Sequence, residues 1–243
     1  MVHKISNLFG KVGIFAKKPF MKFPFIDIHT HRLPEAGDLL SWGIHPWWFD
    51  ADDYDAEADL QWLERLLQED KIAILGETGL DRLHKASLPR QLTAFERQIL
   101  LAEHYGKPLV IHNVRATDEV LRLHRKHSPK NPWLIHGFNG TAEEAKQLTE
   151  KGIFLSVGES LRYENRKIQQ SISSIPWEWL FFETDEYPGE VEVIYEKAAT
   201  LLNLPLEELK ERIFANFVRL NLKIWKTGKT VRVCSSATRA WRP

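Results

Sequence analysis

Short apolar runs alternate along the chain with amphipathic stretches. Each run is bounded by turn-forming or charged residues. The seven runs are FPFIDIH (23–29), LLSWGIH (39–45), KIAILGE (71–77), KPLVIH (107–112), PWLIHG (132–137), IFLSVG (153–158) and EWLFFETD (178–185). Nearly continuous hydrophobicity over so few residues is typical of parallel strands that are buried on both faces. We therefore expect about seven parallel strands.

The segments between these runs have the periodicity of helices. Residues 88–105 place Phe95, Ile99 and Ala102 on one face, and Gly106 is suited to end that helix. TAEE at 141–144 has the spacing of a capping box, which marks the start of another helix. Alternation of strands and helices predicts an α/β fold with a parallel sheet, and a TIM-type (β/α) barrel is the form that closes from such units.

The two ends of the chain differ from its body in charge. Residues 1–22 and 226–243 each carry five basic side chains and no acidic one. Residues 23–225 therefore contain the other 23 basic residues and all 33 acidic residues, which gives this part a formal charge of −10. We expect a leader over 1–20 that is disordered or non-native, a folded barrel over 21–225, and a basic flexible tail over 226–243. An acidic body repels nucleic acid at long range unless metal ions or the basic ends offset its charge.

The amino-acid composition is that of a globular protein without disulfide bonds. The chain is 43% hydrophobic and 27% charged, as in ordinary globular proteins, and no apolar run approaches the roughly 18 residues that span a bilayer. A single cysteine, Cys234, excludes an internal disulfide and a cysteine-rich metal site, and it suits a reducing compartment. We expect a cytoplasmic monomer without a membrane partner.

Side chains that bind metal ions end almost every predicted strand. They are His29, His31, His45, Glu77, His112, His136 and Asp185. In a barrel these strand ends meet at one face, and side chains two apart on a strand point the same way, so His29 and His31 share a side. A divalent ion would relieve the repulsion between Glu77 and Asp185, and mixed nitrogen and oxygen ligands suit Zn²⁺ or Mn²⁺ more than Ca²⁺.

Each of these residues also has a purely structural interpretation. A single histidine at a strand end commonly bonds a backbone carbonyl, and a single carboxylate commonly pairs with a lysine or caps a helix. The joint pattern favours the metal hypothesis. For the other five histidines, which are His3, His84, His104, His124 and His127, we expect structural or surface roles.

Several motifs together resemble one known family. They are HTH at 29–31, GIHP at 43–46, GETGLD at 76–81, IHNVRA at 111–116, IHGFNG at 135–140, ETD at 183–185 and ANFVRL at 215–220. In this order they are similar to the motifs of the TatD-like metal-dependent hydrolases (DNases) of the amidohydrolase superfamily.

The resemblance implies a centre for two divalent ions, of Zn, Mn or Mg. It places one ion on His29, His31 and Asp185, a second on His112 and His136, and Glu77 between them. It also implies hydrolysis of a phosphodiester substrate, which for several members is a DNA end.

The chain departs from the family pattern after the first strand. Relatives usually place a helix, a strand and a second helix between the paired histidines and GIHP, whereas here residues 32–43 fill that interval. We therefore expect one βα unit to be missing and the barrel to be distorted or shortened. ETDEYPGEV also leads quickly into the last helices and alters the family's proline motif, so the substrate-shaping loops differ.

The expected reaction is hydrolysis by a metal-activated water. Asp185 is the candidate general base, and Glu77 is mainly a bridging ligand. His45 and Arg115 are candidates to hold phosphate oxygens. Trp47 and Trp48 are candidates to stack on bases, at about 1–3 kcal/mol each. Capping, a surface salt bridge and core packing are the corresponding structural alternatives.

Two other functions use the same residues. One is hydrolysis of a small carbonyl substrate, a lactone or an amide, by amidohydrolase chemistry. No lysine that could be carbamylated ends a predicted strand, because Glu77 fills the bridging position. The other is a catalytically weak metal-binding homologue that lost activity with its missing βα unit.

Overall fold

The computed structural model describes residues 22–51, 53–163, 167–222 and 229–235. The predicted leader 1–20 lies outside this part of the chain, as do 226–228 and 236–243 of the predicted tail. The strands are β1 (Phe25–Thr30), β2 (Leu39–Trp42), β3 (Ile74–Asp81), β4 (Leu109–Val114), β5 (Trp133–Ile135), β6 (Ile153–Val157), β7 (Leu180–Phe182) and β8 (Thr230–Ser235). Each of the seven predicted runs overlaps a strand, and β1, β3 and β4 extend beyond the predicted ends.

Helices follow most of the strands. The α-helices are α1 (Glu57–Gln68), α2 (Leu88–Tyr105), α3 (Thr117–His127), α4 (Ala142–Thr149), α5 (Lys167–Ser171), α6 (Val191–Leu202) and α7 (Leu206–Arg219). Four 3₁₀-helices accompany them, η1 (Pro46–Asp50), η2 (Glu159–Arg162), η3 (Ile172–Ser174) and η4 (Trp177–Trp179). None of the helices in the described ranges is both long and apolar enough to cross a membrane.

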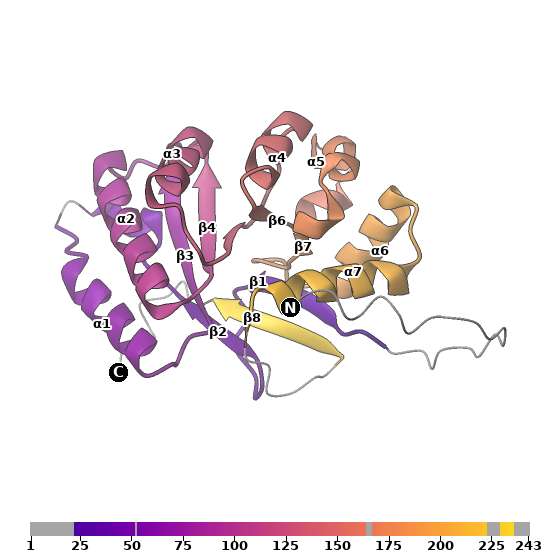
Figure 1. Ribbon diagram of the computed structural model, residues 1–243, viewed down its shortest axis with the longest axis horizontal. Coiled ribbons are helices and arrows are strands. Elements are labelled where there is room, and N and C mark those ends of the chain that lie inside the picture. The colour runs from indigo at the N-terminus through magenta and orange to yellow at the C-terminus, as the bar shows by residue number, and fades with distance from the viewer. Residues whose placement is uncertain (1–21, 52, 164–166, 223–228, 236–243) are drawn as a thin grey trace, which may run out of the picture.

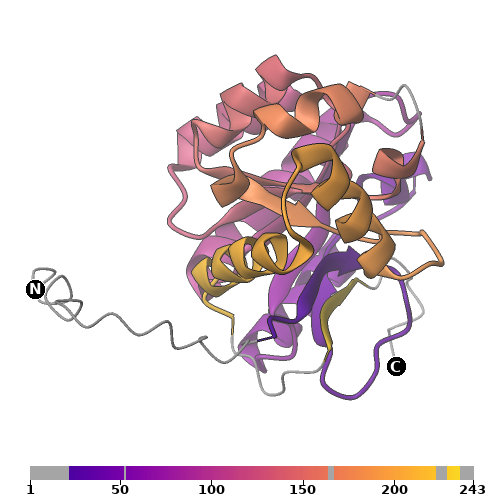
Figure 2. The ribbon, with the colours of Figure 1, turned by 90° about the vertical axis from the view of Figure 1, so that its right-hand side faces the viewer.

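The strands form one parallel sheet in the order β1-β8-β2-β3-β4-β5-β6-β7. The helices lie around it, and α6 and α7 pack beside β1 (Figures 1 and 2). The two outer strands meet at a parallel bridge between Thr30 and Asp185. The sheet therefore curls into an almost closed barrel, and the predicted TIM-type α/β fold is confirmed.

The helix signals in the sequence also hold. Helix α2 buries Phe95, Ile99 and Ala102 and ends at Gly106, whose φ of 66° is left-handed. Burying each of the two larger side chains contributes about 1.5–3 kcal/mol. The capping box at the start of α4 is complete, because Thr141 accepts the Glu144 N–H and the Glu144 carboxylate accepts the Thr141 N–H.

The strand count corrects the prediction of seven. Strand β8 comes from residues 230–235, inside the segment expected to be a flexible tail, and it lies between β1 and β2 and parallel to both (Figure 1). The segment has no helical periodicity. Its buried Val231 and Val233 instead alternate with half-buried Thr230 and Arg232, which is a strand pattern.

This strand explains how a shortened chain still closes a barrel. Residues 31–38 connect β1 to β2 without a helix or strand, as the short interval predicted. Strand β8 supplies the neighbour that β1 and β2 would otherwise lack: Ile26 pairs with Val231, and Leu40 with Cys234. The missing unit is thus compensated by the C-terminal part of the chain.

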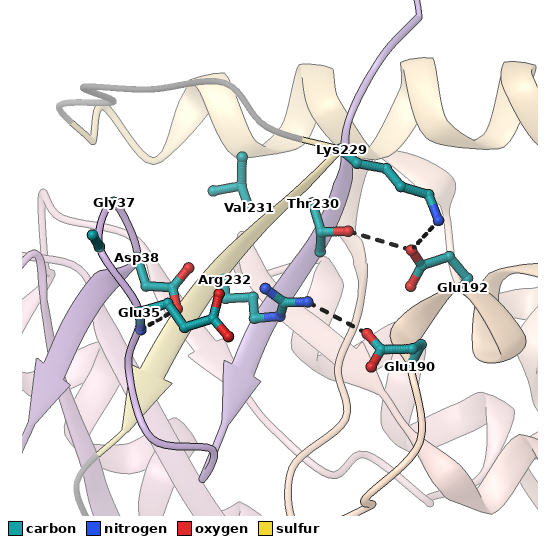
Figure 3. Close-up of a pocket in the computed structure, with 10 residues that line it drawn as sticks. Glu35, Gly37, Asp38, Glu190, Glu192, Lys229, Thr230, Val231 and Arg232 are labelled. Atoms are coloured by element: carbon teal, nitrogen blue, oxygen red, sulfur yellow. Dashed lines mark hydrogen bonds and ion pairs between the residues drawn. The ribbon is translucent and has the colours of Figure 1, made fainter.

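A hollow of about 490 Å³ lies beside β8. Figure 3 shows its charged lining, in which Arg232 reaches Glu190 at 3.3 Å and Lys229 reaches Glu192 at 3.2 Å. Thr230 also donates its hydroxyl to Glu192 at 3.4 Å. These contacts fasten the start of β8 to the start of α6.

Candidate metal centre

Glu77 stands at the middle of the cluster that the strand ends form. One carboxylate oxygen, Oε1, lies 3.0 Å from His45 Nε2, 2.7 Å from His112 Nδ1 and 2.7 Å from His136 Nε2. The other oxygen, Oε2, lies 3.4 Å from His29 Nε2 and 3.3 Å from His31 Nε2. Each oxygen of one buried carboxylate therefore faces a different group of imidazoles.

Close approach of β3 to β4 brings Glu77 and His112 together. Gly79, two residues after Glu77, has a φ of 135°, and a Cβ atom at this position would lie 2.1 Å from the carbonyl oxygen of His112. Only glycine fits such a contact and conformation. The GETGLD motif thus includes the residue that lets the two strands pack.

Asp185 is held against β1 by the backbone. Its N–H donates to the His29 carbonyl at 2.9 Å, and its carbonyl accepts the His31 N–H at 3.0 Å. The preceding Thr184 donates its N–H and its hydroxyl to the Asp27 carboxylate, each at 2.8 Å. Asp185 Oδ1 consequently lies 3.3 Å from His31 Nε2 and 3.7 Å from His29 Nε2.

Glu183 fixes the loop that follows β5. It is fully buried and accepts the Gly137 N–H at 2.5 Å and the Ser156 hydroxyl. Its Oε1 also lies 3.8 Å from His136 Nδ1. Glu183 therefore keeps the chain around His136 in place from β7.

The cluster has unusual protonation in the absence of an ion. Burial opposes the charge on Glu77, but His136 and His112 outweigh burial and hold the pKa of Glu77 well below its usual range. Burial also disfavours charged rings, yet contacts with Asp185 and Glu77 raise the pKa of His31 to about 10, and Glu77 with Glu183 raises the pKa of His136 well above its usual value. Burial lowers the pKa of His45.

The residues present fit divalent ions. Among the described residues, three groups of side chains have ligand atoms within 4.8 Å of one another. The groups are His29 with Glu77 and His136, His29 with His31 and Asp185, and His45 with Glu77 and His112. Both ring nitrogens of His29 are buried without a hydrogen-bond partner. Buried polar atoms are nearly always satisfied, so these nitrogens indicate a ligand. All six predicted metal ligands lie in this cluster.

The predicted substrate contacts are distributed differently. His45 lies in the cluster, and Trp47, which is 47% exposed, lies at its edge with its ring 5.7 Å from that of His112. Arg115 follows β4 and is exposed. Trp48 instead packs against the core, with its ring 5.9 Å from that of Trp42, so it does not line the centre.

Most of the other histidines lie away from the centre. His127 pairs with Glu96 at 2.6 Å, His124 packs on Trp133, and His104 packs on Tyr105. His3 lies outside the described residues. His84 stacks on Trp47 with ring centroids 5.0 Å apart, and its Nδ1 lies 2.8 Å from Asp50 Oδ1, so it borders the mouth.

Two carboxylates that contact the centre were not singled out from the sequence. Asp81 Oδ2 lies 3.2 Å from His112 Nε2, and Glu183 lies beside His136. Both residues belong to motifs that were quoted, GETGLD and ETD. Their place within the same motifs as Glu77 and Asp185 was the signal that could have identified them.

Comparison with known protein families gives a direct match. The family model described as "TatD related DNase" matches residues 29–221. An uncharacterized metal-dependent hydrolase, YabD, of Bacillus subtilis is 30% identical in an alignment of 195 positions that covers 73% of this chain and 75% of that protein. The protein named Deoxyribonuclease Tat-D of Schizosaccharomyces pombe is 26% identical in an alignment of 194 positions that covers 62% of each chain.

Solved structures show the same fold. The TatD homologue YJJV of Escherichia coli K12 superposes with a TM-score of 0.71 at 20% identity, over 82% of this chain and 98% of that one. A TatD family hydrolase of Entamoeba histolytica has a TM-score of 0.68 at 16% identity, with the same coverage.

Proposed function

This chain belongs to the TatD related DNase family, whose named relatives are metal-dependent hydrolases, and we propose that it hydrolyses phosphodiester bonds, including those at DNA ends. The observation that carries the proposal is the position of Glu77. Its two carboxylate oxygens face separate groups of imidazoles across a buried centre. This arrangement suits two cations that share one carboxylate, as in centres that act on phosphate esters.

The ligand sets that we propose are those that the family resemblance implies. His29, His31 and Asp185 would hold one ion. His112 Nδ1 and His136 Nε2 lie 3.4 Å apart and each 2.7 Å from Glu77 Oε1, and they would hold the other ion, with Glu77 shared. Bound divalent ions supply a water of lowered pKa and neutralise negative charge on the phosphoryl oxygens. Zn²⁺, Mn²⁺ and Mg²⁺ are the candidate ions, and the nitrogen-rich ligand set favours the first two.

Asp185 is placed to move the proton of the attacking water. Its side chain is 38% exposed, whereas that of Glu77 is 4% exposed, so Asp185 is the carboxylate of the centre that substrate and water can reach. Burial opposes its charge, but the hydrogen bond with His31 together with the nearby His136 and His29 outweighs burial and lowers the pKa of Asp185. An ionised Asp185 can accept the proton and return it to the leaving oxygen.

Substrate contacts belong to the rim of the barrel. Arg115, exposed after β4, can bind a phosphate oxygen through its guanidinium group. Trp47 presents an exposed indole at the edge of the centre, where a terminal base can stack on it. His45 faces Glu77 from within the centre.

The names of the relatives support metal-dependent hydrolysis more strongly than they support cleavage of phosphodiester bonds. One relative is named a deoxyribonuclease, and the more similar YabD is named only as an uncharacterized metal-dependent hydrolase. Assignment to phosphodiesters is therefore our proposal. It rests on the shared carboxylate and on that relative.

The test is a measurement of metal content followed by substrate screens. Metal-loaded protein is assayed with bis(p-nitrophenyl) phosphate, with single-stranded DNA labelled at either end, and with a lactone. We expect turnover of the phosphodiesters that a chelator abolishes and that Asp185→Asn lacks. The exposed-residue variant Asp53→Asn serves as the matched control. Bound metal with turnover of the lactone alone would overturn the proposal.

A further inference from the structure

Trp47 bonds to two sides of the centre at once. Its backbone N–H donates to His45 Nδ1 at 3.2 Å, and its indole Nε1–H donates to Asp81 Oδ2 at 2.7 Å. The same Asp81 oxygen lies 3.2 Å from His112 Nε2. One tryptophan at the rim is thus linked to two imidazoles that face Glu77.

The hydrogen-bond donors around Asp81 determine which ring nitrogen of His112 carries the proton. Asp81 Oδ1 accepts the N–H groups of Leu83 and His84 at 2.8 and 3.0 Å, and Oδ2 accepts the indole N–H. A carboxylate surrounded by donors acts as an acceptor only, so the nitrogen of His112 that faces it carries the proton. When the ring is neutral, Nδ1 then has its lone pair directed into the centre, 2.7 Å from Glu77 Oε1.

The backbone N–H of Trp47 determines the tautomer of His45. Here the nitrogen that faces Glu77 carries the proton, the opposite of the arrangement in His112. Because Nδ1 of His45 accepts this N–H, the neutral ring carries its proton on Nε2, 3.0 Å from Glu77 Oε1. His45 is then a hydrogen-bond donor to Glu77 and has no lone pair for an ion. His112 is prepared as a ligand, and His45 as a support for the shared carboxylate.

We propose that Trp47 and Asp81 form a positioning unit that fixes His112 as a ligand through Nδ1 and His45 as a donor to Glu77. The inference rests on the metal centre of the proposed function. A group that hydrogen-bonds the non-ligating nitrogen of a histidine orients the ring and sets the basicity of the ligating nitrogen. Loss of such a group typically reduces metal affinity about 10- to 100-fold. Trp47 then acts on the ion through Asp81, whatever it contributes to stacking.

Two substitutions separate positioning from stacking. Trp47→Phe keeps an aromatic ring but removes the indole N–H. Asp81→Asn places an amide NH₂ either at the Oδ2 position, facing the indole N–H and His112 Nε2, or at the Oδ1 position, facing the N–H groups of Leu83 and His84. Either orientation removes the acceptor-only carboxylate that sets the tautomer of His112. Trp62→Phe on α1 is the matched control, since it removes an indole nitrogen that has no hydrogen-bond partner.

The decisive measurement is calorimetric titration of the metal-free variants with Zn²⁺ and with Mn²⁺. We expect Trp47→Phe and Asp81→Asn each to weaken one binding step about 10- to 100-fold and to leave the other within about threefold, because the unit contacts only one side of the centre. The double variant should lose less than the two single losses combined, since both substitutions break one chain of contacts. Trp62→Phe should bind as the wild type does.

A second readout needs no metal. The indole ¹⁵N–H signal of Trp47, assigned by its absence from Trp47→Phe, should shift in metal-free Asp81→Asn and stay unchanged in Trp62→Phe. An unshifted signal, or metal binding by Trp47→Phe equal to that of the wild type, overturns the inference while the proposed function stands. A wild-type protein that binds neither ion overturns both. If Asp81→Asn does not fold, Trp47→Phe at the half-exposed rim decides the question.

Discussion

His31 and Asp185 are joined twice, by a backbone hydrogen bond of 3.0 Å and by a side-chain approach of 3.3 Å between Nε2 and Oδ1. The backbone bond lies where β1 meets the end of β7 and the barrel closes. The side-chain contact lies at the reactive edge of the centre. Closure of the fold and assembly of this part of the site are therefore one structural event.

Removing the carboxylate of Asp185 tests its role as the base. Asp185→Asn keeps the size and the backbone contacts of the residue, but the amide cannot accept a proton. We expect the rate constant kcat for a chromogenic phosphodiester to fall by about 10²- to 10⁴-fold. Metal content and circular dichroism are measured on the same samples, and wild-type turnover by this variant would exclude the assigned role.

Metal binding should release protons. Without an ion, the raised pKa of His31, about 10, and the raised pKa of His136 keep both rings protonated at pH 7, while Glu77 is ionised. Only neutral imidazole binds a metal. Since the folded-state pKa values are raised, proton competition is strongest at acid pH and weakens as pH rises toward 10.

Calorimetry in two buffers of different ionisation enthalpy counts these protons. We expect net proton release at pH 7 and tighter binding at pH 8 than at pH 6. The matched control is His127→Gln, which changes a histidine outside the cluster and should leave both results unaltered. Binding that is independent of pH over this range would show that the rings are neutral before the ion arrives.

Bound metal should stabilise the fold, because the ligands come from strands far apart in the chain. At a free ion concentration 100 times the dissociation constant, binding to the folded state alone adds about 2.7 kcal/mol to the free energy of unfolding. Thermal unfolding with and without a chelator measures this difference. His29→Ala, which removes a fully buried imidazole of the proposed centre, should reduce the stabilisation, and an equal shift in that variant would argue against His29 as a ligand.

The buried thiol of Cys234 reports the insertion of β8. Burial, followed by Asp38, raises the pKa of Cys234 to about 12, so the thiol should resist iodoacetamide at pH 8 in the native protein and react after unfolding in urea. Val233→Ala should destabilise the fold by about 1–3 kcal/mol and speed this labelling, by loss of packing in β8. Rapid labelling of the native wild type would contradict the position of β8.

The sequence was sufficient for much of the fold and of the centre. Runs such as KPLVIH contain both buried strand residues and a candidate ligand, so local hydrophobicity placed His112 in the second half of its strand, two residues before β4 ends. The ligands converge because parallel strands share one orientation, which is a property of the fold class.

Other features depend on contacts that local sequence does not reveal. The alternation over 230–233 is a local signal for a strand, but the position of β8 between β1 and β2 is a fact of topology. Asp81 at the end of β3 and Trp47 in η1 are joined by a hydrogen bond between separate elements, and no spacing in the sequence specifies that bond. The exposed position of Trp47 and the buried position of Trp48 likewise follow from how η1 packs.

The most direct test of the metal-dependent mechanism is a titration of metal-free protein with Mn²⁺ or Zn²⁺ while hydrolysis of bis(p-nitrophenyl) phosphate is followed. The account predicts no turnover without the ion, activity that reaches its maximum near two ions per chain, and complete loss on addition of a chelator. Turnover by the metal-free protein that neither the ion nor the chelator alters would contradict it.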